Sequence, residues 1–379
     1  MNTSIFNEGA ILKSFIVKID DKQISPDNIL NTEIKWGTDF EIKGEMIIND
    51  MQHLASALPF NARNKINISI TDPFNKRYNR TFVISNIQEQ WANSFKNYKI
   101  TFIDEFSWKL KNIYVSKSYK DKKLSEIFED YWTNFKLDDL LGEITKEISP
   151  TTLIKDFIVV PQNVSFYDFI TNEFLKDGYL LYQTKYKIIL KNQDELLPSV
   201  LPKAELDYEE TVINPLYTTK IHEKHVESNF LKSNLEVPIR KGYFYDYNTK
   251  TNIIFNDNLK ENYDSLKLND YDLSDLQKQD GVKLDNFKSL GLKAKNIMLN
   301  TYKDNQKLMI FVTGNNNTKI FQKCGVKLKG DVYMKKEQNE GDIRLNGDYI
   351  CYSFSEKIIG TKMIQKVELA RIDFRDPKA

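Results

Sequence analysis

The sequence predicts a mainly β fold with α+β parts: two small β-barrel domains, an α+β domain and an inserted region of helix and loop. Three observations lead to this prediction. Short stretches within residues 11–111 alternate apolar and polar residues, a period of two that places the apolar ones on one face of a strand, and strand-like runs recur from about residue 201. Clusters of Pro, Asp and Asn separate these stretches. Between residues 112 and 200 the apolar spacing changes to that of amphipathic helices.

Residues 1–111 form the first predicted β-barrel domain. Its first strand is indicated by Phe15, Val17 and Ile19, which alternate with polar or smaller residues. The same alternation recurs in three later stretches: Ile66, Ile68 and Ile70; Phe82 and Ile84; and Tyr98, Ile100 and Phe102. About six short strands at such spacing favour a small barrel or a sandwich. Met51 to Leu58 are compatible with one short helix.

Residues 112–200 form the predicted α+β domain. Its first helix is indicated by apolar residues at helical spacing: Leu124, Ile127, Phe128, Tyr131 and Trp132. A polar stretch broken by a proline follows at residues 137–152, and Phe157–Val160 then predicts a buried strand that ends at Pro161.

The clearest helix start in the chain is at Ser165. Ser165 and Asp168 form a Ser-x-x-Asp capping pattern, and Gly178 is the residue expected just after the helix end. Tyr179–Tyr182 and Tyr186–Leu190 predict a β-hairpin directly after this helix.

Residues 201–240 and 307–365 form the second predicted β-barrel domain, which is discontinuous in the sequence. Asn346-Gly347 is the strongest hairpin-turn signal in the chain. The late strands of this domain are expected at three places: Lys307–Val312, Val326–Met334 and Tyr349–Phe354.

Residues 241–306 are the predicted insertion in the second barrel. A hairpin is expected over Lys241–Phe255, an exposed loop over residues 256–286 and a helix over Phe287–Tyr302. Residues 366–379 are expected to be a polar C-terminal tail.

The composition excludes several classes of function. The 379 residues carry 54 Lys+Arg against 53 Asp+Glu, and this net charge of +1 argues against an obligate nucleic-acid binder. Only 7 of the cations are arginine. No apolar run approaches the roughly 20 residues that span a bilayer, and no signal peptide is evident, so we expect no stable membrane association.

Three short motifs suggest chemistry but do not support it. His222-Glu223-Lys224-His225 has a spacing of three, and His53 is the only other histidine, whereas a zinc site needs three or four ligands. Cys324 and Cys351 have no paired His base and are interpreted as buried, inert thiols. Gly314–Lys319 lacks the second glycine of a phosphate-binding loop and is interpreted as a turn.

Acidic and aromatic clusters are equally unspecific. Glu209-Glu210 is typical of a solvated face. The aromatic run Tyr243, Phe244, Tyr245 and Tyr247 cannot all point inward from one strand, so part of it should meet another chain or a ligand. The sequence therefore predicts no catalytic, cofactor-binding or metal-binding residues and no cofactor.

Three passages carry a resemblance to a known family: Lys99–Asp104 with Leu124–Phe128, Gln162–Ile170 with Gly178–Tyr182, and Gly341–Tyr349 preceded by Phe287–Met298. The first passage is similar to the step from the last strand of a first barrel to the following helix. The second is similar to a core in which a helix is followed by a strand, and the third to the hairpin of a final barrel. The chain thus resembles the baseplate hub proteins of contractile phage tails. That family includes the late control gene D proteins and the hub part of type VI secretion spike proteins. The resemblance covers most of residues 10–365 by order of elements.

The resemblance implies a homotrimer in which three chains with two hub-type barrels each make a pseudo-six-fold ring. Such a ring joins the tail tube protein to the central spike protein, contacts other baseplate proteins, and lines a channel that the tape measure and DNA cross in transit. The lysozyme-like segment and β-helical needle of spike-fused members are not recognisable here, so the spike is expected to be a separate polypeptide. The implied location is the virion tail baseplate, after assembly in the host cytoplasm.

Two other functions stay open at this point. The first is a tail-tip or adhesin component of a non-contractile tail, in which residues 256–286 would contact a receptor or a neighbouring part. The second is a carbohydrate-active hydrolase that uses Asp or Glu, although sequence alone gives no carboxylate separation. A neighbouring sheath gene would argue against the first, and absence of released reducing sugar against the second.

Overall fold

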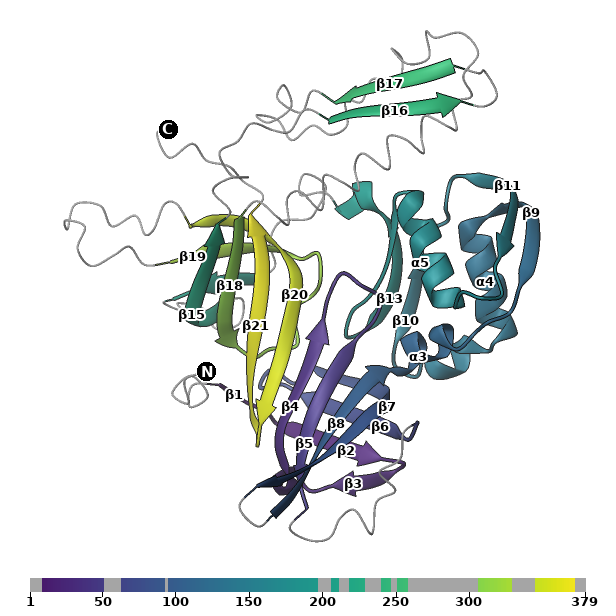
Figure 1. Ribbon diagram of the computed structural model, residues 1–379. Coiled ribbons are helices and arrows are strands. Elements are labelled where there is room, and N and C mark those ends of the chain that lie inside the picture. Colours follow the sequence, from purple (N-terminus) through teal and green to yellow (C-terminus); the bar gives the residue numbers. More distant parts are fainter. Residues whose placement is uncertain are drawn as a thin grey trace, which may run out of the picture.

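Strands dominate the part of the chain that the structure describes, as predicted (Figure 1). The computed structural model describes residues 9–50, 63–92, 95–196, 206–210, 218–228, 240–246, 251–257, 306–328 and 345–371. Within these residues the mainly β fold class with an α+β part is confirmed, and the strands belong to one large sheet and three small ones.

The N-terminal strands form one strongly curved antiparallel sheet. In space the order is β4-β5-β8-β7-β6-β2-β3. Ile66, Ile68 and Ile70 are fully buried, so the predicted alternation is confirmed here. The strands are β2 (Ser14–Ile19), β3 (Lys22–Ile24), β4 (Ile29–Trp36), β5 (Lys43–Asn49), β6 (Lys65–Thr71), β7 (Arg77–Ala92) and β8 (Phe95–Asp104).

The C-terminal strands form a closed six-stranded barrel. Pairing runs β21-β18-β15-β14-β19-β20, and β20 pairs back with β21. A short β1 (Ala10–Ile11) lies along β21. The barrel strands are β14 (Leu206–Glu209), β15 (Thr218–Ser228), β18 (Gln306–Thr313), β19 (Lys323–Lys327), β20 (Gly347–Ile359) and β21 (Lys362–Arg371).

The last strand corrects the expected C-terminal boundary. We expected a polar tail from residue 366, but β21 continues to Arg371. Val367 and Leu369 are buried in the barrel while Lys366 and Glu368 are not, so this segment is an alternating strand. The polar side chains on the outer face of this strand make the segment look like a polar tail in the sequence.

The curved sheet and the barrel are hydrogen-bonded to each other. Strand β4 pairs with β20, from Trp36 opposite Phe354 to Thr32 opposite Ile358. Consequently the described strands of residues 1–111 form an open curved sheet, where we expected a barrel closed on itself. The edge of β4 is already occupied by the second barrel, and both units share one apolar core.

The α+β unit has its own core, formed by helices packed on a small sheet. Its sheet order is β10-β13-β12, and a separate pair joins β9 to β11. Strand β10, parallel to β13, lies in the stretch that we expected to be only polar and irregular. The elements are α3 (Glu105–Lys111), β9 (Lys117–Lys123), α4 (Leu124–Asn134), β10 (Thr145–Ile148), β11 (Ile154–Val160), α5 (Phe166–Lys176), β12 (Tyr179–Gln183) and β13 (Lys187–Asn192).

The predicted helix start and stop in this unit are confirmed. The Ser165 hydroxyl accepts a hydrogen bond from the Asp168 backbone N–H at 3.1 Å and caps α5. Gly178 has a φ of +81°, which is the left-handed conformation expected just after the helix. The rings of Tyr131 on α4 and Phe166 on α5 stack at 3.8 Å and tie the two helices together.

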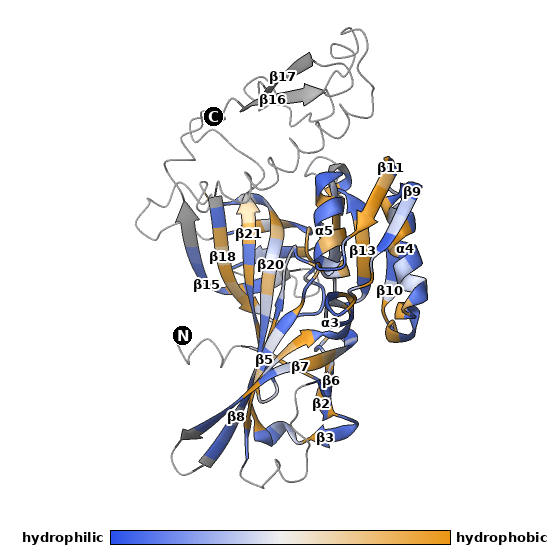
Figure 2. Ribbon diagram, turned by 45° about the vertical axis from the view of Figure 1, so that its right-hand side comes forward, coloured by the Kyte–Doolittle hydropathy of each residue, from blue (hydrophilic) through white to orange (hydrophobic). Residues whose placement is uncertain are grey.

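The strand at Phe157–Val160 exists, but the prediction that it is buried is wrong. Strand β11 pairs only with β9, and the two-stranded sheet has helices on one face alone. Val160 is buried on that face, whereas Phe157 is 68% exposed and Val159 45% exposed on the other. Figure 2 shows β11 as an apolar strand at the outer side of this unit. Exposed apolar surface of this kind is typical of protein–protein contacts.

The hairpin predicted for the insertion is confirmed. Strands β16 (Arg240–Asp246) and β17 (Thr251–Asp257) pair antiparallel in a sheet of their own. Residues 258–286, the helix expected over Phe287–Tyr302 and the helix at residues 51–58 lie outside the described residues.

Two alanine substitutions test the exposure of β11. Phe157→Ala should change the free energy of unfolding by no more than about 0.5 kcal/mol, because its ring is exposed. Phe166→Ala should lower it by about 3–5 kcal/mol, because that ring is fully buried. Urea denaturation followed by tryptophan fluorescence measures both. Equal losses would mean that the outer face of β11 is covered.

Candidate functional site

A buried polar junction lies where the α+β unit, the curved sheet and the barrel meet. The turn between β12 and β13 leaves the α+β unit and places Gln183, Thr184 and Lys185 in this junction, all of them buried. Figure 1 shows β13 between the helices of the α+β unit and the two β units. The side chains of this turn are therefore positioned by a hairpin whose register the β12–β13 ladder fixes.

Lys185 forms an ion pair with Glu356 of the barrel strand β20. The Lys185 Nζ lies 2.5 Å from Glu356 Oε1, and both side chains are almost fully shielded from solvent. The Tyr78 hydroxyl and the Trp36 Nε1–H donate to Glu356 Oε2 at 2.5 and 3.2 Å. Gln365 Nε2 donates to Oε1 at 2.9 Å. The carboxylate is therefore fully hydrogen-bonded by donors from all three units.

The loop between β18 and β19 forms another wall of the junction. Lys185 Nζ donates to the Asn315 carbonyl at 3.0 Å and to Asn316 Oδ1 at 3.3 Å. The Asn316 backbone N–H donates to Asp72 Oδ2 of the curved sheet at 2.9 Å. The side-chain Nδ2 of Asn316 donates to the Lys76 carbonyl at 2.7 Å. This loop thus joins barrel to curved sheet through polar contacts.

A second buried polar group lies beside the first. Arg80 Nη1 donates to Gln183 Oε1 at 3.0 Å, and Gln183 Nε2 donates to Asp104 Oδ1 at 2.8 Å. Gln183 therefore links a buried cation to a buried anion. Burial lowers the pKa of Arg80 to about 10 and raises the pKa of Asp104. The Arg80 guanidinium also lies 5.7 Å from the Trp36 ring, a cation–π contact.

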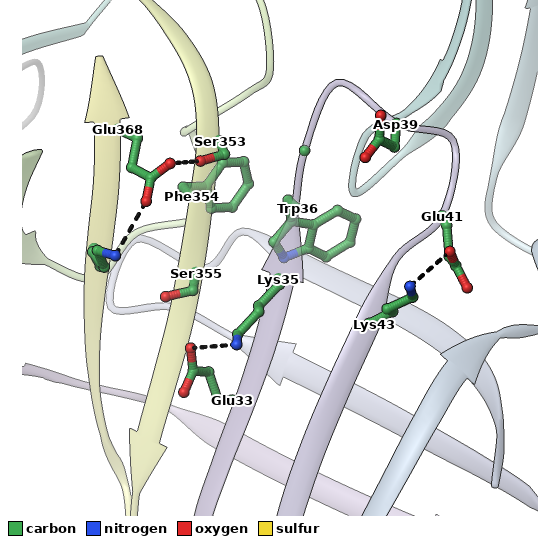
Figure 3. Close-up of a pocket in the computed structure, with 12 residues that line it drawn as sticks. Glu33, Lys35, Trp36, Asp39, Glu41, Lys43, Ser353, Phe354, Ser355 and Glu368 are labelled. Carbon is green, nitrogen blue, oxygen red and sulfur yellow. Dashed lines mark hydrogen bonds and ion pairs between the residues drawn. The ribbon is translucent and has the colours of Figure 1, made fainter. Parts of the chain in front are cut away.

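A groove of about 380 Å³ runs along the seam between β4 and β20 (Figure 3). Three acidic side chains that line the groove form ion pairs with lysines. The pairs are Glu33–Lys35 at 3.8 Å, Glu41–Lys43 at 2.9 Å and Glu368–Lys366 at 3.1 Å. The groove therefore presents charges of both signs along the line where the two β units join.

Comparison with known proteins identifies the fold. No family model matches the chain, and no curated protein matches its sequence. Among solved structures, the chain is similar to a tail protein from Neisseria meningitidis MC58, with a TM-score of 0.60, 8% identity, and coverage of 96% of this chain and 97% of that one. The chain has the fold of a phage tail protein.

Other structures with this tail-protein fold extend the likeness. The 43 kDa tail protein of prophage MuSo2 from Shewanella oneidensis matches with a TM-score of 0.59 and 10% identity, over 94% of this chain and 97% of that one. A type VI secretion component of E. coli, described as similar to the T4 tail proteins gp27 and gp5, matches with a TM-score of 0.53 and 7% identity, over 96% and 76%. The predicted resemblance to hub proteins is thereby confirmed as a likeness of fold.

The histidine and cysteine candidates lie on strands of the barrel. His222 Nε2 contacts Thr313 Oγ1 at 2.9 Å, and His225 pairs with Glu223 at 2.9 Å on the barrel strand β15. The described residues contain no group of three or more His, Cys, Asp or Glu side chains placed to hold a metal ion. Cys324 and Cys351 are buried free thiols, and burial raises the pKa of both, as expected of inert cysteines.

The remaining candidates are also accounted for. Glu209 pairs with Lys327 at 2.7 Å and Glu210 with Lys224 at 3.1 Å, so the two acids serve separate ion pairs. Of the aromatic run, residues 243–245 belong to the backbone ladder of β16, and Tyr247 lies outside the described residues. Among the described helices, none has the length and apolar character that a membrane crossing requires.

Sequence reasoning missed the junction residues, although two of them carry a readable signal. Glu356 falls on the same strand phase as the buried Phe354 and Ile358, and Arg80 on the phase of Tyr78 and Phe82. A charged residue in the apolar phase of a strand indicates a buried, paired charge. Gln183 and Lys185 carry no such signal, because a polar hairpin turn normally faces water.

Substitution of Glu356 tests the energetic weight of the ion pair. Glu356→Gln should lower the free energy of unfolding by about 3–5 kcal/mol, because it leaves a buried cation without its counter-charge. The double variant Lys185→Met/Glu356→Gln should be more stable than Glu356→Gln alone. Glu147→Gln is a matched control: Glu147 pairs with Lys187 and Lys191 at the surface, so its loss should cost less than about 1 kcal/mol. A double variant less stable than the single one would contradict this account.

Proposed function

We propose that this protein is the structural baseplate hub of a phage tail, a mechanical part with no catalytic role. Three copies would form a pseudo-six-fold ring to which each chain contributes its barrel and its curved sheet. This ring would join the tail tube to a separate central spike and surround the channel. The observation that carries the proposal is the full-length likeness of fold to phage tail proteins, over 96% of this chain and 97% of the first neighbour. The order of units along the chain supports it as well.

A structural neighbour from a complex that contains VgrG gives further support for the partners. The chain is similar to the Francisella PdpA–VgrG complex, with a TM-score of 0.54 and 13% identity, over 99% of this chain and 61% of that one. Together with the likeness to tail proteins, this supports our inference that a spike protein, a tube protein and other baseplate proteins are partners of this chain.

The construction of the chain suits a part of a ring. The barrel is closed and shares its core with the curved sheet, so the two β units can act as one rigid body in an assembly. The exposed apolar side of β11 offers surface that association would bury. The balanced charge leaves only weak attraction for DNA, which suits a channel that DNA must leave.

The proposal predicts a trimer in the presence of its partners. Co-expression with the tube and spike proteins of the same tail should give a complex with three copies of this 44.5 kDa chain. Mass photometry measures the copy number, and end-on electron micrographs should show a central hole with three-fold symmetry. One copy per complex, or a particle without a hole, would rule out the hub assignment.

A further inference from the structure

Lys185, Asn316 and Glu356 form a buried triad that the proposed function does not use. Lys185 Nζ lies 3.3 Å from Asn316 Oδ1 and 2.5 Å from Glu356 Oε1. Asn316 and Glu356 are fully buried, and Lys185 is 2% exposed. The carbonyl carbon of the Asn316 amide is one bond, about 1.2 Å, from Oδ1, so the amine nitrogen is close to an electrophilic carbon.

We propose that Lys185 and Asn316 react to form an intramolecular isopeptide bond, with Glu356 as the catalytic proton carrier. A primary amine, a carboxamide and a carboxyl group are the complete set of reactants for this condensation. The site holds them together where all three side chains are buried.

The reaction balances without any co-reactant. First, a proton of the Lys185 ammonium moves along the 2.5 Å contact to Glu356, which leaves a neutral amine and a carboxylic acid. The amine nitrogen then adds to Cγ of Asn316. Glu356 gives its proton to Nδ2 and takes the surplus proton of the attacking nitrogen. The Cγ–Nδ2 bond breaks and ammonia leaves, so one C–N bond forms, one breaks, and nothing is oxidised or reduced.

The surroundings of Lys185 favour the neutral amine that this reaction needs. Burial lowers the pKa of Lys185, and the pair with Glu356 opposes that shift only in part. The Nζ lies 5.3 Å from the ring centres of both Tyr78 and Phe354, so aromatic faces shield the reacting atoms from solvent. After the reaction Glu356 is left as a neutral acid in a site that no longer contains a cation.

The hydrogen bonds of Asn316 orient its amide for attack. Nδ2 donates to the carbonyls of Lys76 and Ile70 at 2.7 and 3.4 Å. Two acceptors on one side and the Lys185 amine on the other fix which atom is nitrogen and which is oxygen. The oxygen thus faces the nucleophile, and the leaving nitrogen is held apart from it.

The bond would connect two units that otherwise touch only through non-covalent contacts. Lys185 and Asn316 are 131 residues apart in the sequence, one in the α+β unit and the other in the barrel loop. A covalent link across this distance restricts the unfolded chain as a disulfide does, and it survives reducing conditions. It would resist a force that pulls the α+β unit away from the barrel.

Intact-mass spectrometry of the purified full-length protein tests the inference directly. We expect a mass below that of the sequence by one molecule of ammonia, and a branched tryptic peptide joining Lys185 to Asn316. Lys185→Arg and Asn316→Ala should each have the mass calculated from their sequence, without loss of ammonia, and should give no branched peptide. The matched control Lys187→Arg alters an exposed lysine paired with Glu147 and should keep the cross-link.

Glu356→Gln separates catalysis from mere proximity. Amine and amide remain in this variant, but the proton carrier is lost, so formation of the link should slow by at least about 100-fold. Tracking the mass over time after purification measures this rate. The proposal would be overturned if the full-length wild-type protein had the mass calculated from its sequence and gave no branched peptide. This holds whatever masses the variants have.

Discussion

As the chain folds, a lysine ammonium that is removed from water must be paired, and this constraint organises the centre of the molecule. Lys185 comes from the α+β unit, its counter-ion Glu356 comes from the barrel, and Tyr78 and Trp36 of the curved sheet complete the carboxylate's hydrogen bonds. No single unit can satisfy these groups alone. Their burial is favourable only when all three units are docked, so the junction specifies one arrangement among them.

The continuous sheet adds a second constraint that acts in the same direction. Pairing of β4 with β20 joins the edge of the curved sheet to one strand of the closed barrel, and the two units share one apolar core. The groove of Figure 3 follows this seam. A part built in this way transmits force without bending at a linker, which suits the mechanical role proposed for it.

Much of this architecture is readable from local sequence, while the junction largely is not. Alternation located the strands at Ile66 and Tyr98, and the Ser165 cap located α5, because each signal lies within a few residues. The exposure of β11 is not predictable in this way, because an apolar run does not reveal whether a second layer covers it. The Lys185–Glu356 pair joins residues far apart in the chain, and only the strand phase of Glu356 hinted at it.

We infer that the junction makes the three units one cooperative body. Native-state hydrogen exchange resolved by mass spectrometry tests it most directly, through amides in β13, β4 and β20. We predict that these three strands open with the same free energy and the same denaturant dependence, as parts of a single global unfolding. Exchange of β13 through a separate opening of lower free energy, while β4 and β20 stay protected, would contradict the claim.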